Sequence, residues 1–146
     1  MNNPSSVVPD GKVGLPPKNT LLPKKLDILP EDSENSKVPQ KIQEYNETEV
    51  WYKKDDKFNR PKAIVNIKIY PQQGILEGLG MTVRGRMQTE LWIAAIKEYL
   101  REFNYMASMA SLELEFTINY DAIQLEFSGF DDSLPEFLTQ ALTKIR

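Results

Sequence analysis

LELEFTINYDAIQLEF, residues 112–127, alternates apolar and polar side chains on either side of Tyr120-Asp121. Alternation with a period of two is typical of a β-strand with one covered face. A two-residue turn at Tyr120-Asp121 would pair apolar residues on one face, namely Ile118 with Ile123, Phe116 with Leu125 and Leu114 with Phe127. Tyr-Asp is a poor type I′ turn, so a longer loop in the same register stays open. The stretch predicts an antiparallel hairpin.

Two further strands are predicted upstream of this hairpin. Glu49 to Lys53 is a short strand that places Trp51 and Tyr52 on opposite faces. Pro61 can begin a strand, because its missing amide donor costs least at the first residue. Residues 63–70 then alternate a fully apolar face with a mixed one, which indicates a strand with one covered face.

Two helices complete the pattern. Residues 87–110 carry an apolar stripe at helical spacing and a second apolar face beside it. The stripe is Ile93, Ile96, Leu100, Phe103 and Ala107, and the second face is Trp92, Ala95, Tyr99 and Met106. The glycine-rich residues 72–85 before them predict a flexible connection. Near the end, Ser133-Leu134-Pro135-Glu136 is typical of a capping box that begins a helix with a buried apolar stripe.

The order β-β-α-β-β-α predicts an α+β sandwich, a mostly antiparallel sheet with helices packed on one face. Residues 1–46 hold seven of the ten prolines, which excludes a helix or a central strand there. We therefore expect a proline-rich extended arm over residues 1–46 and an α+β domain over residues 47–146. Residues 1–14 are expected to be loose, and Leu21 to Leu29 to lie along a surface.

Composition narrows the class of protein. The chain has 146 residues, a formal net charge of −3, and neither cysteine nor histidine. Proteins that bind nucleic acids or anionic membranes usually have an excess of basic residues, so neither partner is expected. A Ser-His-Asp triad, a Cys-His pair and a histidine or thiolate zinc site cannot form. No apolar run approaches the roughly 20 residues of a membrane span. Residues 1–14 contain one lysine and no apolar core, so a secretory signal is not expected there, and a cytoplasmic protein is expected.

The charged segment between Lys53 and Arg60 could be an ion site, since Asp55 and Asp56 supply carboxylates. It lacks the regularly spaced oxygen ligands of a calcium loop. The favoured interpretation is a solvated loop pinned by Phe58 as a buried hook.

Two other clusters also favour a structural interpretation. Arg84 and Arg86 beside glycines could bind an anion, but the spacing fits neither the Walker loop nor the dinucleotide fingerprint. The outer face of the predicted hairpin carries three carboxylates, Glu113, Glu115 and Glu126. An acid–base pair needs a dry cleft, and an exposed sheet face offers none. No catalytic or metal-binding residue is predicted in this chain.

Four segments together resemble the insulysin family of inverted-zinc-motif metallopeptidases. They are Leu15–Pro23, Trp51–Ala63, Glu102–Ala107 followed by Ala110–Leu112, and Phe127–Asp132. The resemblance covers residues 15–146, and four segments in the family's order are more specific than any one alone.

The resemblance implies an enzyme of two halves, each built from two related α+β domains, around a peptide chamber. Zinc would sit in the first domain on an H-x-x-E-H helix with a distant glutamate. This chain resembles the third domain, which has no zinc motif. Its helix from Met87 would stand where the zinc helix stands in the first half, but Gln88 to Ala94 contains no histidine.

The hypothesis is therefore a non-catalytic domain of a zinc metalloendopeptidase, with the zinc in the parent's missing first domain. It would wall the substrate chamber, face the peptide substrate there and dock to the neighbouring domains. Five aromatic residues are expected to dock, namely Trp51, Tyr52, Phe58, Trp92 and Tyr99. Alternatives are a stand-alone interaction or adaptor module and, less favoured, a small enzyme that uses aspartate and glutamate. The chain alone is expected to be inactive.

Overall fold

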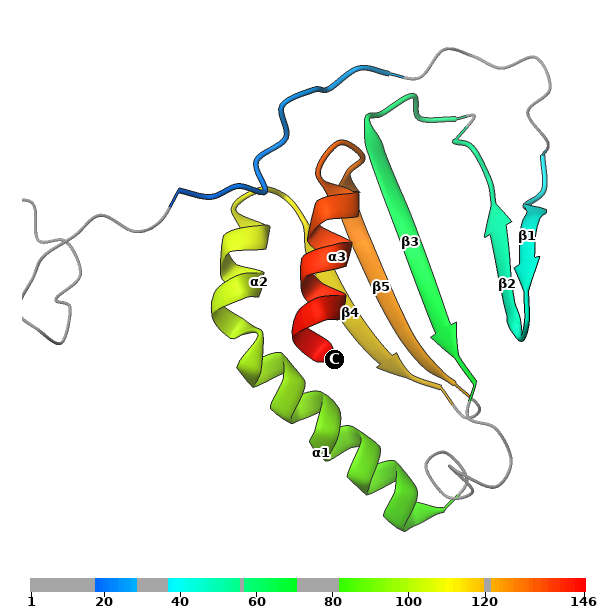
Figure 1. The fold of residues 1–146 in the computed structure, drawn as a ribbon, viewed down its shortest axis with the longest axis vertical. Helices are drawn as coiled ribbons and strands as arrows, with labels where there is room; N and C mark the ends of the chain where they lie inside the picture. Colours follow the sequence, from blue (N-terminus) through cyan, green and yellow to red (C-terminus); the bar gives the residue numbers. More distant parts are fainter. Residues whose placement is uncertain (1–17, 29–36, 56, 71–81, 120–121) are drawn as a thin grey trace, which may run out of the picture.

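The computed structural model describes residues 18–28, 37–55, 57–70, 82–119 and 122–146. Figure 1 shows how its strands and helices are arranged. In chain order they are β1 (Gln40–Tyr45), β2 (Thr48–Tyr52), β3 (Lys62–Ile69), α1 (Val83–Tyr99), α2 (Arg101–Ser108), β4 (Glu113–Ile118), β5 (Ile123–Phe130) and α3 (Leu134–Ile145). The predicted α+β class with antiparallel pairing is confirmed.

β5 is the central strand of a three-stranded antiparallel sheet with the order β3-β5-β4. The predicted hairpin register is confirmed, with Ile118 opposite Ile123, Phe116 opposite Leu125 and Leu114 opposite Phe127. On its other side β5 pairs with β3, and Val65 lies opposite Phe127. Directly opposite residues share a face, so the apolar faces of the three strands coincide. The predicted turn at Tyr120-Asp121 lies outside the described residues.

The core lies between this apolar face and the helices. In Figure 1, α3 runs alongside β5, which it contacts, and α1 and α2 run along the β4 side. Phe127, Phe137, Leu100 and Leu112 are fully buried. The Phe137 ring stacks on Phe103, with centroids 5.5 Å apart, and meets Phe127 edge-on at 5.7 Å. Burial of these large side chains is the main stabilising term of the fold.

The predicted helix over residues 87–110 begins earlier and is interrupted. α1 begins at Val83, because the Thr82 hydroxyl accepts a hydrogen bond of 3.1 Å from the Gly85 amide and caps the first turn. The helix breaks at Leu100, and α2 continues from Arg101 to Ser108. The connection expected over residues 72–85 is therefore wrong for residues 83–85, and residues 71–81 lie outside the described part of the chain.

A strand that the sequence did not predict lies within the expected arm. β1 pairs with β2 in a separate two-stranded antiparallel sheet, and its register shifts by one residue between Lys41 and Gln43. Such a bulge breaks strict alternation, the signal by which a strand is recognised from sequence. Asn46, in the turn, adopts a positive φ of 50°. Asparagine tolerates this conformation better than most residues.

The capping box expected at Ser133 is wrong. Ser133 has helical backbone angles, with φ −99° and ψ −14°, and its side chain makes no capping hydrogen bond. A capping residue needs extended backbone angles to aim its oxygen at the first turn. α3 nevertheless begins at Leu134 with Pro135 in its first turn, as the sequence predicts.

Candidate functional site

The β1–β2 hairpin presents all of its side chains to solvent. Every residue of both strands is exposed, including the aromatic residues Tyr45, Trp51 and Tyr52. A two-stranded hairpin that packs on nothing is at best marginally stable in water. Exposed tryptophan and tyrosine are also the residue types that anchor protein interfaces. The hairpin therefore exposes residue types that are common at protein interfaces.

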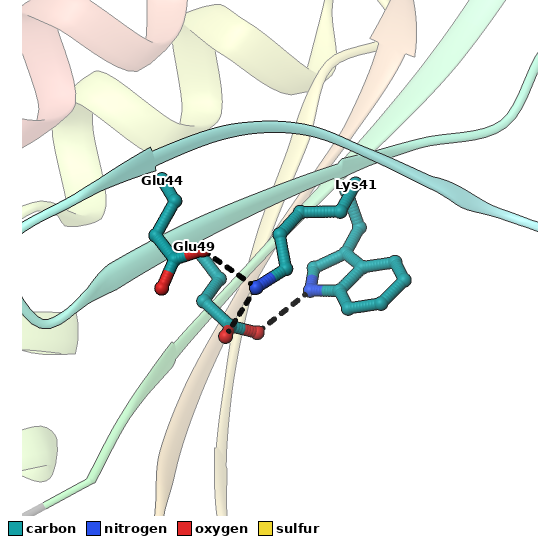
Figure 2. Close-up of polar contacts among 4 residues, drawn as sticks. Lys41, Glu44 and Glu49 are labelled. Carbon is teal, nitrogen blue, oxygen red and sulfur yellow. Dashed lines mark hydrogen bonds and ion pairs between the residues drawn. The ribbon is translucent and has the colours of Figure 1, made fainter.

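Trp51 lies beside a cluster of three charged side chains on this hairpin. Figure 2 shows the ammonium of Lys41 between the carboxylates of Glu44 and Glu49, at 2.8 and 2.9 Å. The other oxygen of Glu49 accepts a hydrogen bond of 3.1 Å from the indole nitrogen of Trp51. The Lys41 ammonium also lies 6.0 Å from the centroid of the indole ring. The indole thus has a hydrogen-bond partner on the hairpin while 56% of the residue's surface stays exposed.

The ionisation of this cluster follows from the same contacts. The hydrogen bonds to Glu44 and then to Glu49 raise the pKa of Lys41. The hydrogen bond from Lys41, followed by the one from Trp51, lowers the pKa of Glu49. Both groups are therefore charged at neutral pH, and the arrangement persists there. The raised pKa of Lys41 and the lowered pKa of Glu49 both move these groups away from proton transfer at neutral pH.

Tyr52 lies on the opposite face of the hairpin from Trp51, because adjacent residues of a strand alternate. It is opposite Gln40 in the register of β1 and β2. Both faces of the hairpin thus carry an aromatic side chain, as the sequence predicts for this strand. The sequence did not predict the charged cluster beside Trp51, which consists of Lys41, Glu44 and Glu49. Two of its members, Lys41 and Glu44, lie in β1, and β1 itself was not predicted.

Phe58 follows the hairpin in the charged loop, and it is not the buried hook that the sequence predicted. It is 70% exposed. The loop is held instead by Asp55, whose carboxylate accepts the amides of Lys57 at 2.9 Å and Phe58 at 3.2 Å. The first of these bonds is the main cause that lowers the pKa of Asp55. Aspartate commonly forms turns because its carboxylate accepts a hydrogen bond from the backbone amide two residues later. With Asp55 in this role, the loop does not need an apolar anchor.

α1 carries the second exposed apolar surface. Trp92, which is 47% exposed, and Tyr99 lie seven residues apart and so on the same side of the helix. Val83, Met87 and Leu91 form a further exposed stripe at four-residue spacing. The sequence did not reveal this stripe, because the first turn of α1 was assigned to the connection. Figure 1 places α1 and the hairpin on opposite sides of the three-stranded sheet, so Trp92 and Tyr99 of α1 lie apart from Trp51 and Tyr52 of β2.

The groups that could carry acid–base or metal chemistry are spread over open surfaces. Glu115 lies opposite Glu126 on the outer face of the sheet, and Glu113 lies opposite Ser128. Within the described ranges no group of three or more histidine, cysteine, aspartate or glutamate side chains is placed to hold a metal ion.

The remaining cluster from the sequence is only partly described. Arg86 does not face an anion site, because its guanidinium pairs with Glu90 one turn along α1 at 3.0 Å. Arg84 is exposed in the first turn of the same helix. Asp56 and the glycines before residue 82 lie outside the described residues. In the part of the chain that the structure describes, no helix is long and apolar enough to span a bilayer.

Comparison with known proteins gives consistent relatives. A family model described as the middle or third domain of peptidase M16 matches residues 3–146. Insulin-degrading enzyme of Homo sapiens is 28% identical over 136 residues, covering 93% of this chain and 13% of that protein. A nardilysin-like protein of Arabidopsis thaliana is 31% identical over 145 residues, covering 97% of this chain and 14% of that protein.

The fold has a solved counterpart as well. A crystal structure of pitrilysin matches with a TM-score of 0.77 at 18% sequence identity. That match covers 93% of this chain and 14% of the pitrilysin chain. The chain thus spans about one seventh of the length of the proteins that it matches.

Proposed function

The chain belongs to the family of the middle or third domain of the M16 peptidases, and we propose that it serves such a zinc metalloprotease as a non-catalytic docking domain. In this role it walls the substrate chamber and binds the neighbouring domains, and its peptide substrates are those of the assembled enzyme. The observation that carries the proposal is the β1–β2 hairpin, which is exposed along its whole length and yet holds Trp51 in one orientation.

The chemistry of the chain supports a non-catalytic role. An M16 zinc site uses an H-x-x-E-H helix. This chain has no histidine, so it cannot supply that motif at any position. α1 stands at the place in the element order where the family resemblance puts the zinc helix, and its residues 88–94 are QTELWIA. The zinc of the complete enzyme would therefore be held elsewhere.

The surfaces support docking. The hairpin and α1 each expose large aromatic and aliphatic side chains, and they do so on different sides of the sheet. Apolar surface of this kind is usually covered by another protein segment. Two such surfaces fit a domain with a neighbour on each side. The relatives are about seven times longer than this chain, so they contain the sequence for such neighbours.

Association with the zinc-bearing half of an M16 protease from the same source tests the proposal. The chain and that half are purified separately, mixed, and followed by size-exclusion chromatography with light scattering. A one-to-one complex is expected, and Trp51→Ser or Trp92→Ser should weaken it. Tyr105→Ser is the matched control, because Tyr105 is an exposed aromatic residue of α2 outside the proposed surfaces. Absence of any complex would contradict the docking role.

A peptidase assay tests the non-catalytic part separately. The pure chain is incubated with zinc and a fluorogenic peptide, with and without a chelator. No chelator-sensitive cleavage is expected. Cleavage that the chelator abolishes, and that co-purifies with the chain through two different columns, would overturn the proposal.

A further inference from the structure

Among the described strands, β3 lies at the edge of its sheet and is paired on one side only. In the three-stranded sheet it pairs with β5, and no described strand pairs with its other side. An edge of this kind presents unpaired amides and carbonyls, which can pair with another extended segment. β3 is eight residues long, enough to bind a segment of ordinary strand length.

The side chains of β3 are incompletely covered. Val65 and Ile67 face the core but are only partly buried, whereas their β5 partners Phe127 and Leu125 are buried. The difference follows from the layout, because α1 and α2 contact β4 and α3 contacts β5. On the outer face, Ile64 is 64% exposed. A strand added beside β3 would extend the apolar face and cover these side chains.

The charges on β3 select the kind of segment that fits. Lys62 and Lys68 lie on the outer face and are exposed. The Lys62 ammonium lies 5.3 Å from the ring centroid of Phe130, its cross-strand partner on β5. This contact places the positive charge of Lys62 at the outer face. Opposite charges directly across two strands stabilise the pair, and like charges destabilise it. Acidic residues are therefore favoured opposite Lys62 and Lys68.

The same charges disfavour a second copy of this chain as the occupant. Antiparallel pairing of two copies centred on Val65 would bring the ammonium groups of Lys62 and Lys68 opposite each other. Lysines on an edge strand are a recognised means of blocking such self-association. A segment with acidic residues six positions apart and apolar residues between them matches both faces of β3.

We propose that the open edge of β3 binds an extended segment from outside this chain, antiparallel to residues 62–68, with acidic residues opposite Lys62 and Lys68 and apolar residues opposite Ala63, Val65 and Ile67. The segment's source rests on the proposed function, since the longer M16 proteases contain further chain that can supply it. Binding of such a segment at the β3 edge does not depend on where the segment comes from. Main-chain hydrogen bonds would give the affinity, and the two lysines would give the charge preference.

Synthetic peptides test this edge on the full chain. The probe is the acetylated and amidated peptide Glu-Val-Thr-Val-Thr-Val-Glu, and the matched control replaces both glutamates by lysine. Amide chemical shifts of the labelled chain report the site and the affinity. At low salt the acidic peptide is expected to bind roughly tenfold more tightly than the basic one, with shifts centred on residues 62–69. The difference should shrink as salt is added.

Charge reversal on β3 makes the test specific. Lys62→Glu together with Lys68→Glu should reverse the preference, so that the basic peptide binds more tightly. Lys97→Glu, an exposed lysine on α1, should leave the preference unchanged. Circular dichroism checks that each variant is folded.

Three results would overturn the proposal. They are equal binding of both peptides, shifts confined to other elements, and a dimer of the free chain that β3 charge reversal alters. Each is distinct from failure of the proposed function, which appears as loss of association with the zinc-bearing half.

Discussion

The side-chain amide of Asn19 donates a hydrogen bond of 2.7 Å to the main-chain carbonyl of Met106 in α2, 87 residues away in the sequence. The oxygen of the same side chain accepts the amide of Leu21 at 3.0 Å. Leu21 is thereby turned into the core, where only 2% of it remains exposed. One asparagine thus fixes the N-terminal arm to the last turn of α2.

Replacing Leu21 should cost far more stability than replacing its neighbour. Leu21→Ala removes a buried side chain from the core cluster and is expected to lower the free energy of unfolding by about 2–4 kcal/mol. Leu22 is 50% exposed, so Leu22→Ala should change it by no more than about 0.5 kcal/mol. Urea denaturation of the two variants measures both. Equal effects would show that the arm is not anchored through Leu21.

Asp132 should act as an acid-sensitive clamp on the same arm. Its carboxylate accepts the amides of Lys24 at 2.8 Å and Lys25 at 3.2 Å. These bonds, the one from Lys24 first, lower the pKa of Asp132. The pKa of Asp132 is lower in the folded state than in the unfolded state. The ionised carboxylate therefore makes its full contribution to folding stability above the ordinary aspartate pKa, near 4, and this contribution is lost as the pH falls through the lowered pKa.

The clamp can be tested by hydrogen exchange at the amides of Lys24 and Lys25. Asp132→Ala should accelerate their exchange at neutral pH, because the acceptor is removed. Asp27→Ala, an exposed aspartate of the arm, should have no such effect. Unchanged exchange in the Asp132 variant would contradict the clamp.

Gly129 should tolerate no side chain. It has a φ of +147°, and a Cβ there would lie 2.7 Å from the carbonyl oxygen of Ser111 and 2.5 Å from a side-chain carbon of Leu112. The first contact is with backbone, which cannot move aside cheaply. Gly129→Ala is expected to destabilise the chain by about 2–4 kcal/mol in thermal or urea unfolding. Ser128→Ala, on the outer face of the same strand, is the control and should be close to neutral.

The two helix starts should respond in opposite ways to loss of a hydroxyl. Thr82 caps α1, so Thr82→Ala should cost about 1 kcal/mol of stability. The Ser133 hydroxyl is buried without a hydrogen-bond partner in the described residues, so Ser133→Ala should be neutral or slightly stabilising. Unfolding of the two variants in urea checks the contrast. If Ser133→Ala lowered the stability more than Thr82→Ala, the result would support the capping box that the sequence predicted.

How far the sequence predicts this fold depends on whether its signals are local. The register of β4 and β5 could be predicted because each apolar residue meets an apolar partner, as with Phe116 and Leu125. The start of α1 could not, because Gly85 suggested a connection although it lies buried inside the helix behind the Thr82 cap. A glycine pattern alone does not distinguish a loop from a closely packed helix turn.

In the candidate site, too, only the features with a local sequence signal could be predicted. Trp51 and Tyr52 were predicted on opposite faces from alternation alone. The cluster of Lys41, Glu44 and Glu49 depends on the β-bulge in β1, which separates Lys41 from Glu44, and on the pairing of β1 with β2, which brings Glu49 to Lys41. Phe58 was expected to pin the charged loop as a buried hook, but it is exposed. The Asp55 turn makes that burial unnecessary.

The most direct test of the docking account is a hydrogen-exchange footprint on this chain in complex with the zinc-bearing half of an M16 protease. Amides of residues 40–52 in the exposed hairpin should exchange rapidly in the free chain and slow markedly in the complex. Residues 83–99 of α1 should also gain protection, whereas residues 134–145 of α3 should change little. A stable complex that leaves both the hairpin and α1 unprotected would contradict the account.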